Sequence, residues 1–181
     1  MKATGIVRRI DDLGRVVIPK EIRRTMRIRE GDPLEIYTDR EGGVIFKKYS
    51  QLGDISDFAG DLCDVLSRAC GQGAAVTDRD GCIAVGGVAR RELLDKRISP
   101  RLEALMEARR SWQHQSGGER LSVCEETDKY FVLTAVPILS GGDVLGCVLF
   151  LAADGADERT GEVELTLAQT AAAFLGKHME G

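Results

Sequence analysis

The chain has 181 residues, a formal net charge of −4 and a sequence pI near 5.3. This length has room for one domain of ordinary size and one small domain. No apolar stretch approaches the roughly 20 residues of a membrane-spanning helix, and no signal peptide precedes the basic start. These features exclude a membrane protein, and we expect the chain to be cytoplasmic.

The charge is divided unevenly between two parts of the chain. Residues 1–50 carry 12 Lys and Arg against 8 Asp and Glu, whereas residues 51–181 carry 13 against 21. An acidic average that conceals a basic end indicates a phosphate-binding module fused to a different domain. Residues 1–50 contain no Cys and no His, which excludes disulfides and zinc as a means of stabilising so small a module. Self-association remains, so we expect this module to be an obligate dimer.

Four predicted strands surround one predicted helix in residues 1–50, in the order β-β-α-β-β. The strands are expected at residues 4–10, 15–18, 34–38 and 44–48. Turn sequences separate them at residues 11–14, 31–33 and 39–43. Pro19 can open the helix, which we expect to run to about Arg29. This order leaves strand edges unpaired in a single chain, and a second copy would satisfy them.

The predicted helix carries its cations on one face. They occupy positions i, i+3, i+4 and i+7, namely Lys20, Arg23, Arg24 and Arg27. Ile22 and Met26 form a separate apolar stripe that is expected to face inward. Like charges four residues apart destabilise an isolated helix by roughly 0.2–0.5 kcal/mol per pair, which favours a helix that lies against a polyanion. A solvated basic face is the alternative, and the net positive charge of the segment argues against it.

The segment LGRVVIP at residues 13–19 and the basic helix after it resemble the DNA-binding domain of the AbrB family of bacterial transition-state regulators. The resemblance covers the first 50 residues without gaps. It implies a β-barrel in which two chains exchange hairpins, with surface arginines lying along DNA. By motif position, the DNA-binding residues that it implies are Arg8, Arg15, Arg23 and Arg24, with Lys2, Arg9 and Lys20 as weaker candidates.

Double-stranded DNA is the partner that the residues favour. An Arg guanidinium can fork onto phosphate oxygens or onto guanine O6 and N7. The predicted first two strands and the helix contain no aromatic residue on which single-stranded bases could stack. The resemblance implies that DNA shape contributes to recognition, which would leave only a loose consensus.

Residues 51–70 are predicted to form an amphipathic helix that links the two domains. Its apolar positions follow a 3-4-3-4 spacing, at Ile55, Phe58, Leu62, Val65 and Ala69. Aspartates at positions 54, 57, 61 and 64 occupy the opposite side. This spacing suits a helix that packs against a helix of another subunit and joins two dimers into a tetramer. A helix that covers its own domain fits the spacing equally well.

Residues 71–181 are predicted to form a second domain, an α+β sandwich in which helices back an antiparallel sheet. Strands are expected at residues 74–77, 82–85, 121–125, 130–139 and 144–152, and helices at residues 101–110 and about 160–179. The segment VPILSGGDVLGCVLFLA, residues 136–152, resembles the last hairpin of a GAF domain, a sensory fold of cytosolic bacterial proteins. The sequence pattern of cyclic-nucleotide-binding GAF domains is absent, which argues against a cyclic nucleotide as the ligand.

The order of the two domains carries a further resemblance. An AbrB-type domain followed by a GAF-like domain in 181 residues is similar to a family of transcriptional regulators of spore-forming bacteria. The resemblance implies a nucleoid-associated regulator in the forespore that activates or represses sporulation promoters. We hypothesise that a small-molecule effector binds between the sheet and the helices of residues 71–152. A ligand-free domain kept for assembly is the alternative.

No catalytic motif is present, and we expect neither enzymatic activity nor a cofactor or metal. G-x-x-x-x-G-K, G-x-S-x-G and H-E-x-x-H are all absent. The five cysteines, an odd number, lie in the second part, mostly in apolar runs, and are expected to be reduced and buried. Two other functions stay open. One is an antitoxin of a toxin–antitoxin pair, because swapped-hairpin domains also occur there. The other is a GAF-fold thiol-dependent reductase that uses Cys82, Cys124 or Cys147.

Overall fold

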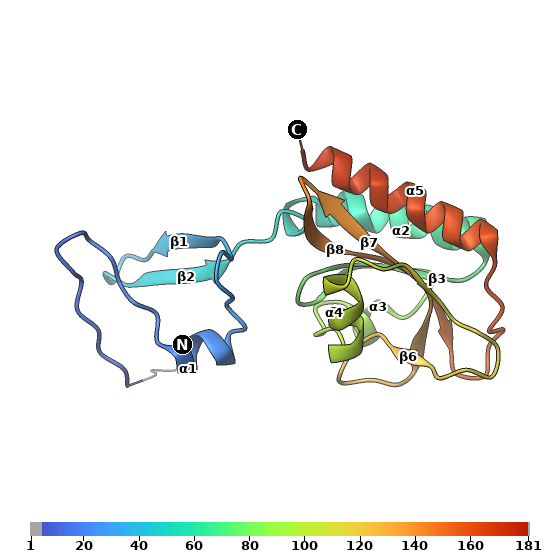
Figure 1. The fold of residues 1–181 in the computed structure, drawn as a ribbon, viewed down its shortest axis with the longest axis horizontal. Helices are drawn as coiled ribbons and strands as arrows, with labels where there is room; N and C mark the ends of the chain where they lie inside the picture. The colour runs from blue at the N-terminus through green and yellow to red at the C-terminus, as the bar shows by residue number, and fades with distance from the viewer. Residues whose placement is uncertain (1–4, 181) are drawn as a thin grey trace. The chain divides into compact units, whose positions relative to one another are not determined.

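The computed structural model describes residues 5–180 (Figure 1). The chain divides into two compact units, Met1–Tyr49 and Ser50–Gly181. The candidate Lys2 lies outside the described residues. No described helix has both the length and the apolar composition that crossing a membrane requires.

The first unit contains a short helix and a hairpin. Helix α1 covers Lys20–Thr25, and strands β1 (Leu34–Thr38) and β2 (Val44–Lys48) pair in antiparallel order. The two strands have the bounds that the sequence predicts. Asp39 closes the turn between them, because its carboxylate accepts hydrogen bonds from the backbone N–H groups of Glu41 and Gly43 at 3.0 and 2.7 Å.

Helix α1 is shorter than the sequence predicts, because a left-handed residue ends it. Arg27 has φ 49°, and the N–H groups of Arg27 and Ile28 donate to the carbonyls of Arg24 and Arg23. This is a Schellman motif, which usually places a glycine at the left-handed position. The arginine there concealed the helix end, and Arg27 lies outside the helix rather than on its cationic face. Met26, expected to face inward, is exposed in the single chain.

The two strands predicted before α1 are not formed as strands in the described part of residues 4–18. Residues 5–10 and 15–18 run beside no partner strand, and a tight turn at Asp11–Gly14 joins them. Figure 1 shows them as the open loop that leads into α1. A strand needs a neighbour for its backbone hydrogen bonds, and the single chain supplies none here. The prediction of two strands is therefore wrong for one chain by itself.

The second unit is an α+β sandwich around one antiparallel sheet. The strands lie in the order β4-β3-β8-β7-β5, with β6 also paired to β7. Their bounds are Gly73–Asp78 for β3, Cys82–Gly86 for β4, Trp112–Gln113 for β5, Leu121–Ser122 for β6, Tyr130–Ser140 for β7 and Asp143–Ala153 for β8. A 3-10 turn (Gly53–Ile55) precedes the helices, which are α2 (Ser56–Cys70), α3 (Arg90–Leu93), α4 (Pro100–Glu107) and α5 (Glu162–His178). The α+β prediction is confirmed, and the sequence missed the short elements β5 and α3.

Hydrophobic side chains fill both faces of this sheet. Along β8, Phe150 belongs to a cluster beneath α2 and α5, whereas its neighbours Leu149 and Leu151 belong to a cluster beneath α3 and α4. Helices α2 and α5 lie side by side on the first face (Figure 1). A strand that is buried on both faces reads as a continuous apolar run, which is why β8 was easy to predict. On the second face Leu102 and Met106 of α4 leave almost no exposed surface.

Helix α2 packs on its own sheet through a narrower face than the spacing indicated. Ala59, Cys63 and Leu66 are buried, and Phe58 and Val65 remain exposed. The backbone of α2 comes so close to β4 that a Cβ added to Gly86 would lie 2.5 Å from the Cys63 carbonyl carbon. Small residues at this contact allow that approach. Within one chain the alternative interpretation, a helix that covers its own domain, describes this packing.

Candidate nucleic-acid interface

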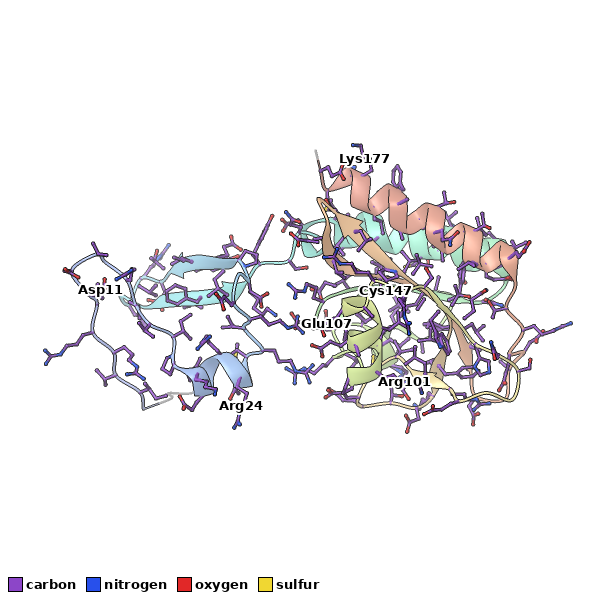
Figure 2. The ribbon with its side chains drawn as sticks, in the orientation of Figure 1. Asp11, Arg24, Arg101, Glu107, Cys147 and Lys177 are labelled. Carbon is purple, nitrogen blue, oxygen red and sulfur yellow. The ribbon has the colours of Figure 1, made fainter. Side chains whose placement is uncertain are left out.

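The cations of α1 are presented to solvent. Lys20, Arg23 and Arg24 are exposed, and α1 buries none of its residues. Figure 2 shows the side chain of Arg24 pointing away from the β1–β2 hairpin. Neither arginine forms an ion pair with a carboxylate in the part of the chain that the structure describes. Their guanidinium donors are therefore available to an anionic ligand.

The candidates of the open loop lie on both sides of the tight turn. Arg8 and Arg9 precede it and Arg15 follows it, and all three are exposed. The turn is closed by backbone hydrogen bonds of 3.0 Å from Asp11 N–H to the Arg15 carbonyl and from Gly14 N–H to the Asp11 carbonyl. Gly14 has φ 76°, a conformation that favours glycine. The turn thus places these arginines on the two arms of one loop, whereas Arg23 and Arg24 come from α1.

Asp11 organises this turn and holds Arg15. Its carboxylate accepts hydrogen bonds from the N–H groups of Leu13 and Arg15 at 3.0 and 2.8 Å, and from Arg15 Nε at 2.8 Å. The hydrogen bonds from the Arg15 backbone and side chain lower the pKa of Asp11. The pair engages Nε alone, so the two terminal nitrogens of the guanidinium remain for a phosphate or a base edge.

Asp11 is a residue that sequence reasoning missed. Its spacing to the turn and to Arg15, in the sequence Asp-Asp-Leu-Gly-Arg, was the available indication, because aspartate readily hydrogen-bonds backbone two residues ahead. Pattern alone did not show which of Asp11 and Asp12 has this role. The structure assigns it to Asp11 through the contacts to Leu13 and Arg15.

Exposed apolar side chains accompany the cations throughout residues 5–49. No hydrophobic residue between positions 5 and 49 is buried, and Val7 and Ile10 are 89% and 69% exposed. Other large apolar residues of the unit are exposed as well, including Leu13, Val17, Met26, Ile36 and Val44. Single exposed apolar side chains are ordinary, but a soluble protein rarely leaves so many of them exposed in one small unit unless another surface covers them.

The cysteines of the second unit lie in surroundings that disfavour the thiolate. Burial raises the pKa of Cys63 to about 12 and the pKa of Cys124 to about 11. Burial also raises the pKa of Cys82 and of Cys147. All five cysteines are free thiols. A nucleophilic cysteine requires the opposite environment, one that lowers its pKa.

Two family models match the chain. The model described as "Stage V sporulation protein T C-terminal, transcription factor" matches residues 54–180. The model described as "Antidote-toxin recognition MazE, bacterial antitoxin" matches residues 7–54.

One curated relative matches the full length of the chain, and another matches only part of it. The chain is 48% identical over 183 residues to stage V sporulation protein T of Bacillus subtilis (strain 168), and the match covers 99% of each chain. It is 56% identical over 63 residues to the transition state regulatory protein AbrB of the same organism, which covers 32% of this chain and 65% of that protein.

Solved structures are similar to each part separately. The N-domain of the transcription factor AbrB is 64% identical over 28% of this chain and 94% of its own, with a TM-score of 0.26. The cofactor-binding GAF domain of the nutrient sensor CodY from Clostridium difficile is 15% identical. That match covers 66% of this chain and 83% of its own, with a TM-score of 0.44.

Proposed function

This chain belongs to the stage V sporulation protein T family of transcription factors, and we propose that it regulates sporulation promoters by gripping duplex DNA with the first units of two chains. One observation carries the proposal. Among the described residues, Arg23 and Arg24 of α1 are exposed and form no ion pair with a carboxylate, in a unit whose apolar side chains also remain exposed. The DNA contacts that we propose are Arg8, Arg15, Arg23 and Arg24, with Lys2, Arg9 and Lys20 in support. The protein acts on chromosomal DNA in the cytoplasm of the forespore.

A dimer of first units follows from what one chain lacks. Residues 5–18 have strand-like sequence and no partner strand, and hydrophobic residues of the unit are exposed. Exchanging these hairpins between two chains would give each strand a neighbour and bury the apolar residues together. The 56% identity of this part to AbrB supports the swapped-hairpin arrangement that its sequence motif implies.

A tetramer of full-length chains is supported by an aromatic cluster on α2 and α5. The rings of Phe58 and Phe174 lie 5.9 Å apart, and the His178 ring lies 5.8 Å from that of Phe58. Both phenylalanines are exposed, as are Val65 of α2 and Val163 of α5. Two such helices present an apolar surface that suits the same pair of helices in a second copy. We propose that this contact joins two dimers.

The filled interior of the second unit favours an assembly role for that domain over a small-molecule sensor. Side chains of α3, α4 and the sheet occupy the space where the effector was hypothesised, and Ile98, Leu102 and Leu149 have no exposed surface there. A ligand would have to displace packed side chains. We therefore propose a scaffold that holds the DNA-binding units at a high effective concentration.

The two other functions are less well supported. An antitoxin of the expected kind ends in a short segment for its toxin, whereas this chain matches a transcription-factor domain over residues 54–180. That domain has a hydrophobic cluster on each face of its sheet. A thiol-dependent reductase would need a reactive cysteine, and the raised pKa of Cys82, Cys124 and Cys147 leaves little thiolate at neutral pH.

The salt dependence of DNA binding tests the proposal directly. Four arginines from each of two chains, each on a phosphate, predict a slope of roughly −7 when log affinity is plotted against log salt concentration. Fluorescence anisotropy with a labelled duplex at several salt concentrations measures this slope for the full-length protein. A slope near −2 would contradict the proposal.

A further inference from the structure

An ion pair in the first unit involves a carboxylate that is shielded from solvent. The side chain of Asp32 is 4% exposed, although no hydrophobic residue is buried among residues 5–49 around it. Lys48 Nζ lies 3.3 Å from Asp32 Oδ2, and the same oxygen accepts a hydrogen bond of 2.8 Å from Arg29 N–H. Lys48 is the last residue of β2, so the pair connects this strand to the segment between α1 and β1.

The same lysine also holds the end of α1. Lys48 Nζ donates a hydrogen bond of 3.0 Å to the carbonyl oxygen of Arg27, the left-handed residue that terminates the helix. A Lys at this position satisfies a carbonyl near a helix C-terminus and interacts favourably with the helix dipole. One ammonium group therefore contacts both the helix end and the shielded carboxylate.

Helix α1 depends on such contacts for its placement. It has six residues and buries none of them, and an isolated helix of this length is unstable in water. Its C-terminal turn is fixed by backbone bonds, and Lys48 links that turn to the β1–β2 hairpin. We propose that Lys48 and Asp32 are positioning residues that set the orientation of α1 and so place Arg23 and Arg24 against DNA. This inference rests on the proposed DNA contacts of those two arginines.

The geometry limits the effect to the arginines of α1. Arg15 is held by Asp11 in a separate turn, whereas Lys48 bonds to the segment that follows α1. Removing the Lys48 ammonium leaves the Asp32 carboxylate shielded with one partner fewer, which loosens the segment between α1 and β1. Arg23 and Arg24 then lose their fixed position, whereas Arg15 keeps its own.

The test compares two neighbouring lysines. Lys48→Gln removes the positioning interaction, and Lys47→Gln removes the same charge one residue away, where the ammonium lies 4.6 Å from the centre of the Tyr37 ring. In the proposed dimer, two arginines from each chain depend on Lys48, so Lys48→Gln is expected to reduce the salt slope by up to about 4. Lys47→Gln removes one charge from each chain and should reduce the slope by at most about 2. Lys48→Arg should retain most of the wild-type affinity, because a guanidinium can donate hydrogen bonds to both the Arg27 carbonyl oxygen and the Asp32 carboxylate. Equal slopes for the two Gln variants would overturn the inference.

A double-mutant cycle separates positioning from general destabilisation. Arg23→Ala should cost much less affinity in the Lys48→Gln background than in the wild type, whereas the cost of Arg15→Ala should be the same in both. Additive effects of Arg23 and Lys48, or equal coupling of Lys48 to Arg15, would overturn the inference. If Arg23→Ala alone leaves affinity unchanged, the proposed DNA contact fails, and that result is visible before any Lys48 variant is made.

A second variant guards against loss of folding. Asp32→Asn combined with Lys48→Gln removes both charges of the ion pair together, and it should show the same loss of coupling to Arg23. Light scattering and amide hydrogen exchange of the β1–β2 hairpin check that each variant keeps its oligomer and its strands. Retained coupling to Arg23 in this folded double variant would overturn the inference.

Discussion

Residues 5–49 and the unit that begins at Ser50 differ in whether their apolar side chains are buried. The first has no buried hydrophobic residue, whereas the second buries one cluster on each face of its sheet. Both contain comparable strand sequences, such as residues 15–18 in the first and β8 in the second. The difference is that β8 has neighbours within its own chain, on both sides, and residues 15–18 have none. The second unit forms its core within one chain, whereas residues 5–49 form none, as our proposal of a first unit completed by a second copy requires.

The largest expected effect is on stability, and it is measured by making the same Ile→Ala substitution in each unit. Ile138 of β7 is fully buried, and Ile138→Ala should destabilise the second unit by about 2–5 kcal/mol. Ile10 is exposed in one chain, where such a change should cost no more than about 0.5 kcal/mol. If a second chain covers it, Ile10→Ala should cost about as much as Ile138→Ala. Thermal unfolding of both variants at several protein concentrations measures this.

The dependence of unfolding on protein concentration is the internal control for the Ile10→Ala and Ile138→Ala variants. The transition of the first unit should move to higher temperature as the protein is concentrated, because a dimer is favoured by mass action. An effect of Ile10→Ala within the range of surface substitutions would show that the unit is not completed by a second copy.

A smaller effect, on the assembly state, is expected from substitution of an exposed apolar residue of the second unit. Phe58→Glu should convert a tetramer to a dimer without unfolding the domain, because burying a phenylalanine contributes about 1.5–3 kcal/mol per copy and a charge cannot replace it. Leu139→Glu is the matched control, since Leu139 is 43% exposed and Phe58 is 41% exposed. Light scattering that shows the same mass for Phe58→Glu and Leu139→Glu would contradict the assembly proposal.

Sequence patterns located most elements of the second unit because local and tertiary preferences agree there. The run of apolar residues in β8 and the Ser99-Pro100 start of α4 mark their elements directly. Ser99 Oγ accepts the Leu102 N–H hydrogen bond at 3.2 Å as a helix cap. The face of α2 was harder to predict, because Ala59 and Cys63 pack against the sheet while the larger Phe58 lies outside. Spacing identifies an apolar stripe and does not show which of two neighbouring stripes meets its own sheet.

The sequence indicated which charged residues to consider for DNA contact, and that assignment stays a prediction, whereas it did not show which interactions hold these residues in place. Arg23 and Arg24 stand out by their helical spacing, whereas Arg8 and Arg15 were candidates through the family resemblance alone. The end of α1 was missed because Arg27, rather than a glycine, adopts the left-handed conformation. The hydrogen bond from Lys48 crosses 21 positions of the sequence to reach Arg27, and no local pattern encodes that interaction.

Arginine substitutions in the first unit should affect DNA binding, whereas an arginine substitution in the second unit should not. Arg23→Ala or Arg24→Ala should weaken binding to most duplex sequences alike and reduce the salt slope by about 2, one contact from each chain of a dimer. Arg68→Ala, in the exposed part of α2, removes an arginine from a helix of the second unit and should leave the slope unchanged. Anisotropy titrations at several salt concentrations compare them. Unaltered binding for both α1 variants would remove them from the interface.

The smallest expected effect concerns two aspartate–arginine pairs, one in each unit. Arg15 lowers the pKa of Asp11, and Arg159 lowers the pKa of Asp157 to about 2. A carboxyl whose pKa is lowered in the folded state stabilises that state above the pKa of the unfolded chain. This stabilisation disappears as the pH falls through the folded value. Both contributions should therefore be present at neutral pH and be lost only in acid.

DNA should distinguish these two carboxyl groups. If Arg15 moves its guanidinium toward a phosphate, the interaction of Asp11 with Arg15 weakens and a negative group approaches, and both changes raise the pKa of Asp11. Asp157 lies in the second unit, beside Arg159, and has no role in the proposed contacts, so its pKa should not change. Carboxyl carbon NMR of aspartate-labelled protein, titrated with and without a short duplex, measures both groups in one sample. An upward shift of Asp11 alone would place Arg15 on DNA. Equal behaviour of the two carboxyls would show that no phosphate approaches the Asp11–Arg15 pair and would remove Arg15 from the proposed set.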